Sequence, residues 1–322
     1  MKVSELGERE LISRIAKLLV KSGDNVIEGA GEDDCAVLDI GGKDYLLITT
    51  DMLHRKTDFP PQMTARQIGW MSVAVNLSDL ASKGAQPLGL LMAMGIPPDT
   101  EVGFVDDIVK GMGECASKYG TEIIGGDTDS HDELTITGTA LGLVKKELLI
   151  RRSGGRPGDA VCVTGRPGLA GAALLALSNG IPVSQEISKA LFEPIPRIYE
   201  GIALAESGAV TSMMDISDGL ALSLHDMAKA GGIGFKIREN KLPALPEITG
   251  LGKEILRDAA LFAGGDFELL FTVAPDRMTQ ARKACPFAII GEVIKNGVFI
   301  EGKTGLADLE PRGYEHFRIK KP

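Results

Sequence analysis

Six short acidic motifs recur along the chain, each flanked by glycine, serine or threonine and lying beside an apolar segment. They are Asp33-Asp34, Thr49-Thr50-Asp51, Ser78-Asp79, Gly125-Gly126-Asp127, Asp215-Ile216-Ser217-Asp218 and Gly264-Gly265-Asp266. Any one of them is explained equally well as a helix cap or a turn, because Asp and Ser side chains accept hydrogen bonds from backbone N–H groups. Six together are harder to explain in this way, because several carboxylates that come close together need cations to offset their repulsion.

The side chains in these motifs offer hard oxygen ligands, which favour Mg²⁺ over zinc or copper. Mg²⁺ in proteins usually keeps several waters and shares its coordination sphere with substrate phosphates. Glycine beside a carboxylate lets backbone N–H groups approach phosphate oxygens closely. The motifs therefore predict chemistry on Mg²⁺ and phosphate. The simplest form is phosphoryl transfer from ATP, in which positioning and charge neutralisation do most of the work.

One further pattern would indicate a different kind of nucleotide site. Residues 297–304 match the P-loop pattern G-x-x-x-x-G-K-[ST] at every fixed position. A P-loop follows a strand and opens a helix. Here Asn296-Gly297 is typical of a hairpin turn, residues 298–301 have the pattern of a strand, and residues 305–311 are too few for a helix. We therefore expect a hairpin and not a P-loop.

Composition excludes several classes of protein. The 322 residues include 35 basic and 44 acidic side chains, for a net charge of −9, so duplex nucleic acid and anionic membranes would repel the chain. With 44% hydrophobic residues and a mean hydropathy of +0.08, the chain can bury a core, which excludes wholesale disorder. The forty glycines show no collagen-like period.

No segment has the pattern of a signal peptide or a membrane span. Glu and Arg interrupt the apolar residues at the N-terminus, and the longest apolar stretch, near residues 88–97, is far shorter than the ~18 residues that a span requires. The four cysteines are widely separated and form no C-x-x-C pair, which favours buried, reduced thiols. We expect a cytoplasmic enzyme that binds neither nucleic acid nor membrane.

Hydrophobic periodicity places these motifs on helices and strands that do not strictly alternate, which predicts an α+β (mixed α/β) fold. Turn-forming and charged residues at 151–159 are the candidate boundary between two domains, 1–148 and 149–322. Residues 75–81 and 214–221 resemble each other, which is slim support for an internal duplication. The expected helices cover residues 8–21, 65–83, 99–120, 169–178, 185–192, 197–207, 220–230, 253–262 and 277–284. The expected strands cover residues 35–40, 45–50, 88–94, 123–124, 134–144, 160–164, 210–215, 235–238 and 268–273, with two more near the C-terminus.

In their order along the chain, the motifs resemble those of the thiamine-monophosphate kinases. The similarity rests on Asp-Asp-Cys-Ala-Val, Thr-Thr-Asp-Met-Leu, Ala-Val-Asn-Leu-Ser-Asp-Leu-Ala, Gly-Gly-Asp-Thr, Arg-Ser-Gly-Gly-Arg-Pro-Gly-Asp, Asp-Ile-Ser-Asp-Gly-Leu and the terminal Gly-Tyr-Glu-His-Phe. It extends over residues 29–317, and the ordered set is far more specific than any single motif. The wider superfamily uses ATP without a P-loop; it includes aminoimidazole-ribonucleotide synthetase, selenophosphate synthetase and a hydrogenase maturation protein.

This resemblance implies a two-domain fold like that of aminoimidazole-ribonucleotide synthetase. Its N-terminal domain would bind ATP and Mg²⁺ and would pair its sheet with that of a second subunit in a homodimer. The resemblance also implies an enzyme, a kinase that transfers a phosphoryl group directly and in line from ATP to thiamine monophosphate. The products would be ADP and thiamine diphosphate, and several Mg²⁺ ions would take part.

The resemblance further assigns roles to individual residues of this sequence. The implied catalytic residues are Asp51, Asp79, Asp127 and Asp215. The implied Mg²⁺ ligands are Asp34, Thr49, Thr50, Asp51, Asp79, Asp127, Asp215 and, for a further ion, Asp218. The implied nucleotide contacts are Gly126, Asp127, Arg152 and Ser217. Tyr314 matches the position that lines the thiamine ring pocket, and an aromatic wall suits a planar cationic thiazolium.

Three positions depart from the family pattern. Glu32 is an extra acidic residue in front of Asp33. Gly265 is followed by one acidic residue instead of two, which leaves Asp266 as the candidate substrate contact in that motif. Asp58 stands where the family often has histidine, and it becomes the candidate to face the thiamine cation.

Two other functions stay open on the sequence alone. One is another ATP-using activity of the same superfamily, although the chain lacks the N-terminal cysteine nucleophile of selenophosphate synthetase and the C-terminal cysteine of the carbamoyl dehydratase. The other is a non-catalytic scaffold that binds Mg²⁺ and nucleotide, which the altered motif at Gly264-Gly265-Asp266 suggests.

Overall fold

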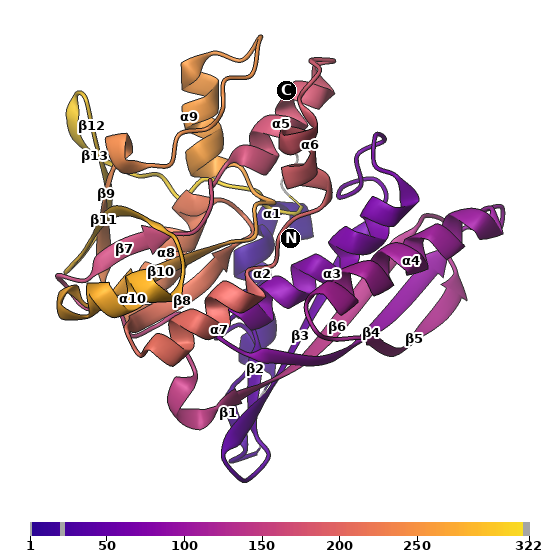
Figure 1. Ribbon diagram of the computed structural model, residues 1–322, viewed down its shortest axis with the longest axis horizontal. Coiled ribbons are helices and arrows are strands. Elements are labelled where there is room, and N and C mark those ends of the chain that lie inside the picture. The colour runs from indigo at the N-terminus through magenta and orange to yellow at the C-terminus, as the bar shows by residue number, and fades with distance from the viewer. Residues whose placement is uncertain (1, 20–22, 318–322) are drawn as a thin grey trace.

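Two sheets, with helices packed on and between them, make up the protein (Figure 1). The computed structural model describes residues 2–19 and 23–317. The first sheet has six strands in the order β1-β2-β3-β6-β4-β5, and the second has seven in the order β13-β12-β9-β11-β7-β10-β8. This mixture of helix and sheet confirms the predicted α+β class.

The first sheet is built from the N-terminal part of the chain. Only its β4–β5 pair is parallel. The helices α3 and α4 pack together against one of its faces. Its elements are β1 (Val26–Glu28), β2 (Ala36–Asp39), β3 (Asp44–His54), α3 (Ala65–Ser82), β4 (Gln86–Ile96), α4 (Val102–Lys118), β5 (Ile123–Ser130) and β6 (Thr135–Lys145).

Helix α3 is buried along most of its length, because its residues are apolar or small on all sides. The helix starts after Thr64, whose hydroxyl accepts a hydrogen bond from the N–H of Gln67. Its contact with α4 is close, since a Cβ on Gly69 would lie 1.9 Å from the carbonyl oxygen of Ile108. The polar side chains in the second half of α3 are therefore carried into the interior, where each needs a partner.

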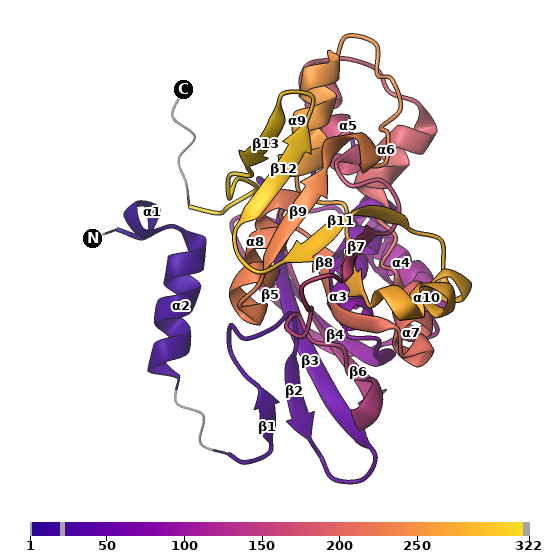
Figure 2. The ribbon, with the colours of Figure 1, turned by 90° about the vertical axis from the view of Figure 1, so that its left-hand side faces the viewer.

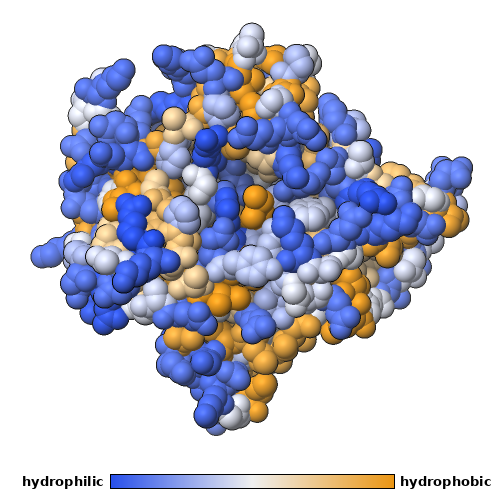
Figure 3. All heavy atoms as spheres, in the orientation of Figure 1, coloured by the Kyte–Doolittle hydropathy of each residue, from blue (hydrophilic) through white to orange (hydrophobic). Residues whose placement is uncertain are grey.

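The opposite face of the first sheet presents apolar side chains to the outside. Met52, Leu88, Leu91 and Ile124 are each 42–55% exposed. Figure 3 shows apolar side chains gathered along the lower side of the molecule, below α3 and α4. Exposed apolar side chains gathered on one face often mark an interaction surface.

The second sheet is antiparallel except for the β9–β12 pair. One cluster of buried apolar residues continues from the first sheet through α3 to one face of the second sheet, and α8 covers the other face. The strands are β7 (Ala160–Val163), β8 (Val210–Ile216), β9 (Gly234–Arg238), β10 (Glu268–Val273), β11 (Ala288–Ile294), β12 (Val298–Gly302) and β13 (Gly305–Asp308). The helices are α5 (Leu169–Ser178), α6 (Gln185–Phe192), α7 (Ile198–Ser207), α8 (Leu220–Gly231), α9 (Lys253–Phe262) and α10 (Met278–Ala284).

Two N-terminal helices, α1 (Val3–Leu6) and α2 (Glu8–Leu18), stand beside the body of the protein (Figure 2). Helix α2 contacts the C-terminal segment, where Glu8 accepts a hydrogen bond of 2.8 Å from the N–H of His316. Three short 3₁₀ turns complete the described structure: Lys146–Leu148, Glu239–Lys241 and Pro275–Arg277. Among the described helices, none combines the length and the apolar character of a membrane span.

The predicted elements differ from the observed ones mainly at their ends. The helix expected over residues 99–120 begins at Val102, and the helix expected over 8–21 ends at Leu18, with residues 20–22 outside the described ones. The strand expected at 123–124 extends to Ser130, because residues 125–130 pair with β4. β1 is only three residues long and was not expected. The β12–β13 hairpin confirms that residues 297–304 are not a P-loop.

The two similar motifs behind the suggested internal duplication lie in different kinds of element. Residues 75–81 lie inside α3, whereas residues 214–221 run from the end of β8 into the start of α8. The Ser-Asp pair of the first motif therefore sits within a helix, where it caps nothing, and that of the second sits in a loop. The similar letters do not mark equivalent positions.

Candidate active site

Helix α3 passes between the two sheets (Figure 1), and three carboxylates gather at this place. Asp51 comes from β3, Asp79 from α3 and Asp215 from the end of β8. We call these three residues the carboxylate cluster. Thr49 lies two residues before Asp51 on β3, so both side chains point to the same face of the sheet, toward α3. The cluster thus combines residues from both sheets and from the helix between them.

Hydrogen bonds fix the members of the carboxylate cluster. The hydroxyl of Thr49 donates to Oδ2 of Asp79. The hydroxyl of Ser78 donates to Oδ2 of Asp215 over 2.6 Å and so ties α3 to β8. The side-chain oxygen of Asn76 accepts from the backbone N–H of Asp51 over 3.1 Å. These bonds come from the buried half of α3, so the helix holds the cluster on both sides.

Among the described residues, no lysine or arginine forms an ion pair with the three carboxylates of the cluster, and the pKa of each is raised. Burial, followed by the charges of Asp218 and Asp34, raises the pKa of Asp51 to about 6. Burial and the charge of Asp34 raise the pKa of Asp215 to about 7, although the hydrogen bond from Ser78 opposes this. Burial and the charge of Asp51 raise the pKa of Asp79 well above its ordinary value. A cation from outside the chain would stabilise the ionised forms of all three.

Asp218 lies next to the cluster, in the loop after β8. Burial raises its pKa to about 6, although Arg9 of α2 opposes the rise. The Arg9 guanidinium lies 3.2 Å from the Asp218 carboxylate and 2.9 Å from that of Asp226. The tail of the chain also reaches this loop, since the N–H of Tyr314 donates to the carbonyl oxygen of Asp218 over 3.0 Å. Both ends of the chain therefore converge on Asp218.

Asp33 and Asp34 have the opposite electrostatic environment. Lys83, the residue after α3, donates to both carboxylates, with 2.8 Å to Asp34. Arg152 pairs with Asp34 through its guanidinium and with Asp33 through its backbone N–H at 2.9 Å. Burial would raise the pKa of Asp34, but the charges of Arg152 and Lys83 hold it well below its usual range. This pair is therefore already neutralised by the protein.

The residues around the cluster fit Mg²⁺ rather than a metal that needs a closed cage. Within residues 2–19 and 23–317, no three His, Cys, Asp or Glu side chains converge tightly enough to enclose an ion by themselves. Mg²⁺ does not require this, because it commonly binds through one or two carboxylates, waters and substrate phosphates. The donors at the site are all oxygen atoms, and their uncompensated charge is the feature that a divalent cation would relieve.

Two of the predicted ligands do not reach the cluster within one chain. Thr50 follows Thr49 on β3, so its side chain points to the opposite face of the sheet, where it accepts a hydrogen bond from Thr139. Asp127 is exposed on the edge strand β5. It lies in register with Ala93 of β4 and, further across the sheet, with Met52 of β3, so these side chains are on the same open face. Asp127 is three strands from β3, or about 14 Å.

Gly126 has a structural reason to be glycine. A Cβ there would lie 1.9 Å from the carbonyl oxygen of Met92, so a side chain would break the β4–β5 pairing. Ser217 is half-buried between Asp215 and Asp218, at the edge of the cluster. Arg152 is turned toward Asp33 and Asp34. Of the four predicted nucleotide contacts, Ser217 and Arg152 therefore lie beside the carboxylates, and Gly126 and Asp127 lie on β5.

Two of the three predicted substrate contacts lie in one region. Tyr314 is 40% exposed, and burial, followed by the charges of Asp58, Glu8 and Asp218, raises its pKa. Asp58 also closes the turn after β3, where its Oδ2 accepts from the N–H of His54 and from the hydroxyl of Thr57, each over 2.7 Å. Tyr314, Asp58 and Asp218 thus form an acidic, partly aromatic surface beside the cluster.

Asp266 has a role besides the one predicted. Its carboxylate accepts from the N–H of Gly168 over 2.5 Å and from that of Ala170 over 3.0 Å. It therefore caps the start of α5, whose N-cap residue, Gly168, has no side chain to do so. Burial raises the pKa of Asp266 to about 7. The carboxylate therefore has the capping role that was the alternative for every acidic motif, and its contact with substrate stays a prediction.

Sequence reasoning missed three residues of the site. Asn76 belonged to a recognised motif, and a polar residue in the apolar part of α3 was the available signal. Lys83 was predicted only as the end of a helix, and its position directly after small and apolar helical residues was the available signal. Arg9 gave no signal, since its partners Asp218 and Asp226 lie more than 200 positions away.

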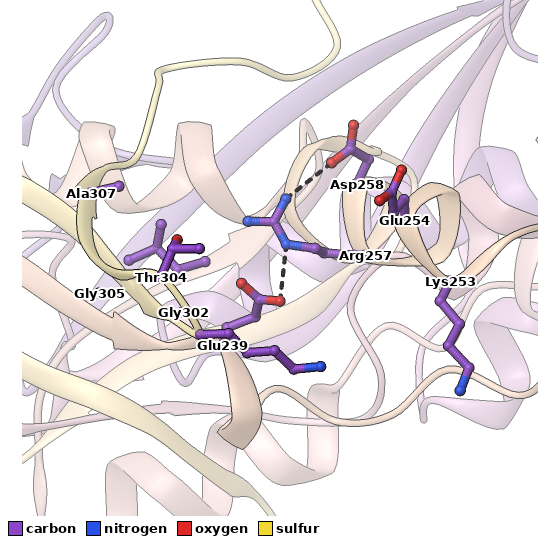
Figure 4. A pocket seen from close by; sticks show the side chains of 11 residues that line it. Glu239, Lys253, Glu254, Arg257, Asp258, Gly302, Thr304, Gly305 and Ala307 are labelled. Carbon is purple, nitrogen blue, oxygen red and sulfur yellow. Dashed lines mark hydrogen bonds and ion pairs between the residues drawn. The ribbon is translucent and has the colours of Figure 1, made fainter.

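A separate cavity of about 520 Å³ lies between α9 and the β12–β13 hairpin (Figure 4). Arg257 crosses it, 3.0 Å from Glu239 and 3.4 Å from Asp258. None of its lining residues belongs to the carboxylate cluster or to the predicted site. The cavity includes Lys303 and Thr304 of the P-loop-like motif, but these residues lie at a hairpin and not at the start of a helix.

The chain is similar to known proteins over most of its length. The AIR synthase related protein N-terminal domain matches residues 32–144, and the corresponding C-terminal domain matches residues 156–302. The chain is 41% identical over 285 residues to the thiamine-monophosphate kinase of Methanospirillum hungatei, covering 88% of this chain and 92% of that protein. It is 34% identical to the thiamine-monophosphate kinase of Archaeoglobus fulgidus, covering 98% of this chain and 99% of that protein.

Two solved structures have a fold similar to that of this chain. The fold matches a structure described as AaThiL complexed with AMPPCP and TMP with a TM-score of 0.86 at 28% identity, over 98% of this chain and 99% of that one. It also matches the hydrogenase maturation protein HypE in complex with ATP, with a TM-score of 0.71 at 21% identity, over 88% of this chain and 90% of that one. The second match is similarity of fold alone.

Proposed function

The chain belongs to the thiamine-monophosphate kinase family, within the AIR synthase related proteins, and from this premise we propose how its carboxylate cluster serves the reaction. The protein is an ATP-dependent kinase that phosphorylates thiamine monophosphate to thiamine diphosphate. The observation that carries the proposed mechanism is the charge of Asp215, which is buried, and of Asp51 and Asp79, which are partly buried, with no ion pair to offset it among the described residues.

In this proposal the carboxylate cluster, Thr49 and the neighbouring Asp218 hold Mg²⁺. When bound, Mg²⁺ supplies positive charge that neutralises the phosphates and the charge that develops during transfer. The protein itself holds the ligand side chains in position before Mg²⁺ binds. Thr49 and Ser78 hold Asp79 and Asp215 by hydrogen bonds, and Asn76 holds the backbone of Asp51.

The acceptor would bind where Tyr314, Asp58 and Asp218 converge. A thiazolium ring is planar and cationic, so it is attracted both to an aromatic face and to nearby carboxylates. The chain's tail lies across the loop of Asp218, which would bring the phosphate of a bound thiamine monophosphate toward the cluster. Arg152 and Ser217, beside the carboxylates, are the proposed contacts to nucleotide phosphates.

We further propose a homodimer that forms across the open face of the first sheet, where Met52, Leu91 and Ile124 are exposed. Thr50 and Asp127 lie on this same face, so their part in metal binding depends on what covers it. Leu91→Asp should convert a dimer to a monomer in light scattering, whereas a surface control such as Lys110→Asp on α4 should not. A wild-type protein that scatters as a monomer at micromolar concentration would contradict the dimer.

The mechanism is tested by coupled measurement of ADP release. Turnover should require both Mg²⁺ and thiamine monophosphate, and thiamine and aminoimidazole ribonucleotide should not replace the latter. Asp51→Asn and Asp79→Asn should each lower kcat at least 100-fold while the circular dichroism spectrum is retained. Unchanged turnover in both variants would refute the metal assignment.

The four cysteines are buried and unpaired, as expected for a reducing compartment, which supports the proposal of a cytoplasmic enzyme. The superfamily alternatives are not favoured, because the identity to thiamine-monophosphate kinases extends over nearly the full length of both chains.

A further inference from the structure

Lys83 is a buried cation whose ammonium group contacts only other groups of the protein. Its side chain is 1% exposed, and it follows directly on the last residue of α3. The Nζ group donates to Oδ1 of Asp33 and to the carbonyl oxygen of Met213 at 3.1 Å, and it lies 2.8 Å from Oδ2 of Asp34. An ammonium group has three donors, so each has an acceptor.

The surroundings keep this group charged. Its Nζ group lies within hydrogen-bond distance of two carboxylates, those of Asp33 and Asp34, so the positive charge is directly offset by opposite charge. A buried ammonium without such partners would be costly and would lose its proton. Lys83 is therefore a permanent positive charge at the edge of the carboxylate cluster.

Lys83, Ser82 and Arg152 together use most of the ligand capacity of Asp34. Oδ2 of Asp34 lies 2.8 Å from Lys83 and accepts from the Ser82 hydroxyl at 2.8 Å, while Oδ1 accepts from Arg152. A carboxylate offers roughly four acceptor positions, so about one is left. Asp51, Asp79 and Asp215 have no lysine or arginine ion pair among the described residues.

The same ammonium group links the two sheets. Asp33 and Asp34 precede β2 of the first sheet, whereas Met213 belongs to β8 of the second and lies two residues before Asp215. Lys83 therefore fixes the distance between the Asp33–Asp34 segment and the strand that carries Asp215.

We propose that Lys83 is an internal cation of the active site, which occupies the place beside Asp33 and Asp34 that a metal ion would otherwise fill and so confines Mg²⁺ to the carboxylate cluster, Thr49 and Asp218. Lys83 acts as a positioning residue, because its charge acts through the carboxylates and not on the substrate. This inference rests on the proposed function for its Mg²⁺, but its test requires no turnover.

The test is the melting temperature of the full chain in EDTA and in a series of MgCl₂ concentrations at constant ionic strength, without nucleotide. Lys83→Met keeps the length of the side chain and removes its charge. It should lower Tm by roughly 10 °C in EDTA, because it leaves two buried carboxylates short of a partner. Millimolar Mg²⁺ should restore at least half of that loss, and calorimetric titration should show one more bound Mg²⁺ than in wild type.

Two further variants separate this role from simple packing. Lys83→Met combined with Asp33→Asn removes both members of the ion pair, and it should recover most of the Tm in EDTA without binding the additional ion. Lys118→Met, at the end of α4, is the matched control: this lysine lies over the ring of Trp70 and should show no change in Mg²⁺ dependence.

The proposal is overturned if Lys83→Met loses the same Tm at every Mg²⁺ concentration, if it loses none, or if it binds no additional ion. If Lys83→Met does not fold in EDTA, the variant that combines it with Asp33→Asn decides the question. A Tm of this double variant that depends on Mg²⁺ as in wild type supports the internal cation, and a double variant that does not fold refutes it. Absence of kinase activity in the wild type would refute the proposed function while leaving these melting and titration results interpretable.

Discussion

Replacing Asp215 by Asn should stabilise the Mg²⁺-free protein while it abolishes most of the activity. Asp215 is 2% exposed, and burial with the charge of Asp34 raises its pKa from 3.8 to about 7. Asn keeps the shape of the side chain, and its oxygen can still accept the hydrogen bond from Ser78. The substitution therefore removes the charge and leaves the packing in place.

The magnitude follows from the pKa. The Asp215 carboxyl of the unfolded chain loses its proton near pH 3.8, whereas that of the folded, Mg²⁺-free protein keeps it until about pH 7. The folded state thus binds more protons within this window, and its stability falls as the pH rises from about 4 to about 7. At about 1.4 kcal/mol for each tenfold change, the ionised group costs about 4 kcal/mol above pH 7 and less than about 2 kcal/mol at pH 5.

The assay is urea unfolding of the wild type and of Asp215→Asn, in EDTA, at pH 5 and pH 8. The variant should gain about 2–4 kcal/mol at pH 8 and clearly less at pH 5, and millimolar Mg²⁺ should reduce the difference at pH 8 by stabilising only the wild type. At the same time kcat should fall at least 100-fold. A variant that is less stable than the wild type at pH 8, or a gain of equal size at both pH values, would refute the argument from uncompensated charge.

Three other substitutions test separate parts of the structure. Ser78→Ala removes the 2.6 Å hydrogen bond to Asp215, so it should cost about 1–3 kcal/mol in urea unfolding and lower kcat; no loss of stability would mean that the bond does not join the sheets. Tyr314→Ala should raise the KM for thiamine monophosphate several-fold with little change in kcat, and an unchanged KM would identify the ring as a tail anchor only. Gly126→Ala places a Cβ 1.9 Å from the oxygen of Met92 and should cost about 1–3 kcal/mol of unfolding free energy; a stable variant would show that β4 and β5 can separate at no cost.

The site divides electrostatically into two parts. Asp33 and Asp34 are balanced by Lys83 and Arg152, whereas Asp51, Asp79 and Asp215 are left with excess negative charge. Carboxylates that lie close together without a cationic partner lower the stability of the folded protein but create a binding site for cations. This is a common compromise at active sites. The family function and this imbalance lead to the same conclusion about where Mg²⁺ acts.

Much of this was readable from the sequence. The acidic motifs beside glycine and serine indicated hard-cation and phosphate chemistry because ligand type depends only on residue type. Hydrophobic periodicity located most helices and strands because it reflects burial along one element. The letters around residues 297–304 were correctly rejected as a P-loop, since the strand pattern and the Asn296-Gly297 turn were local features.

Only the tertiary structure decided which charges meet. Thr50 and Thr49 are neighbours in sequence but lie on opposite faces of β3, and Asp127 lies on an edge strand about 14 Å from that strand. Asp266 caps α5, a helix that begins nearly 100 residues before it. Lys83 meets Asp33 from 50 positions away along the chain, and Arg152 meets Asp34 from 118 positions away. Charge compensation depends on distance and burial, and both are set by how the two sheets pack on α3, which no local pattern in the sequence records.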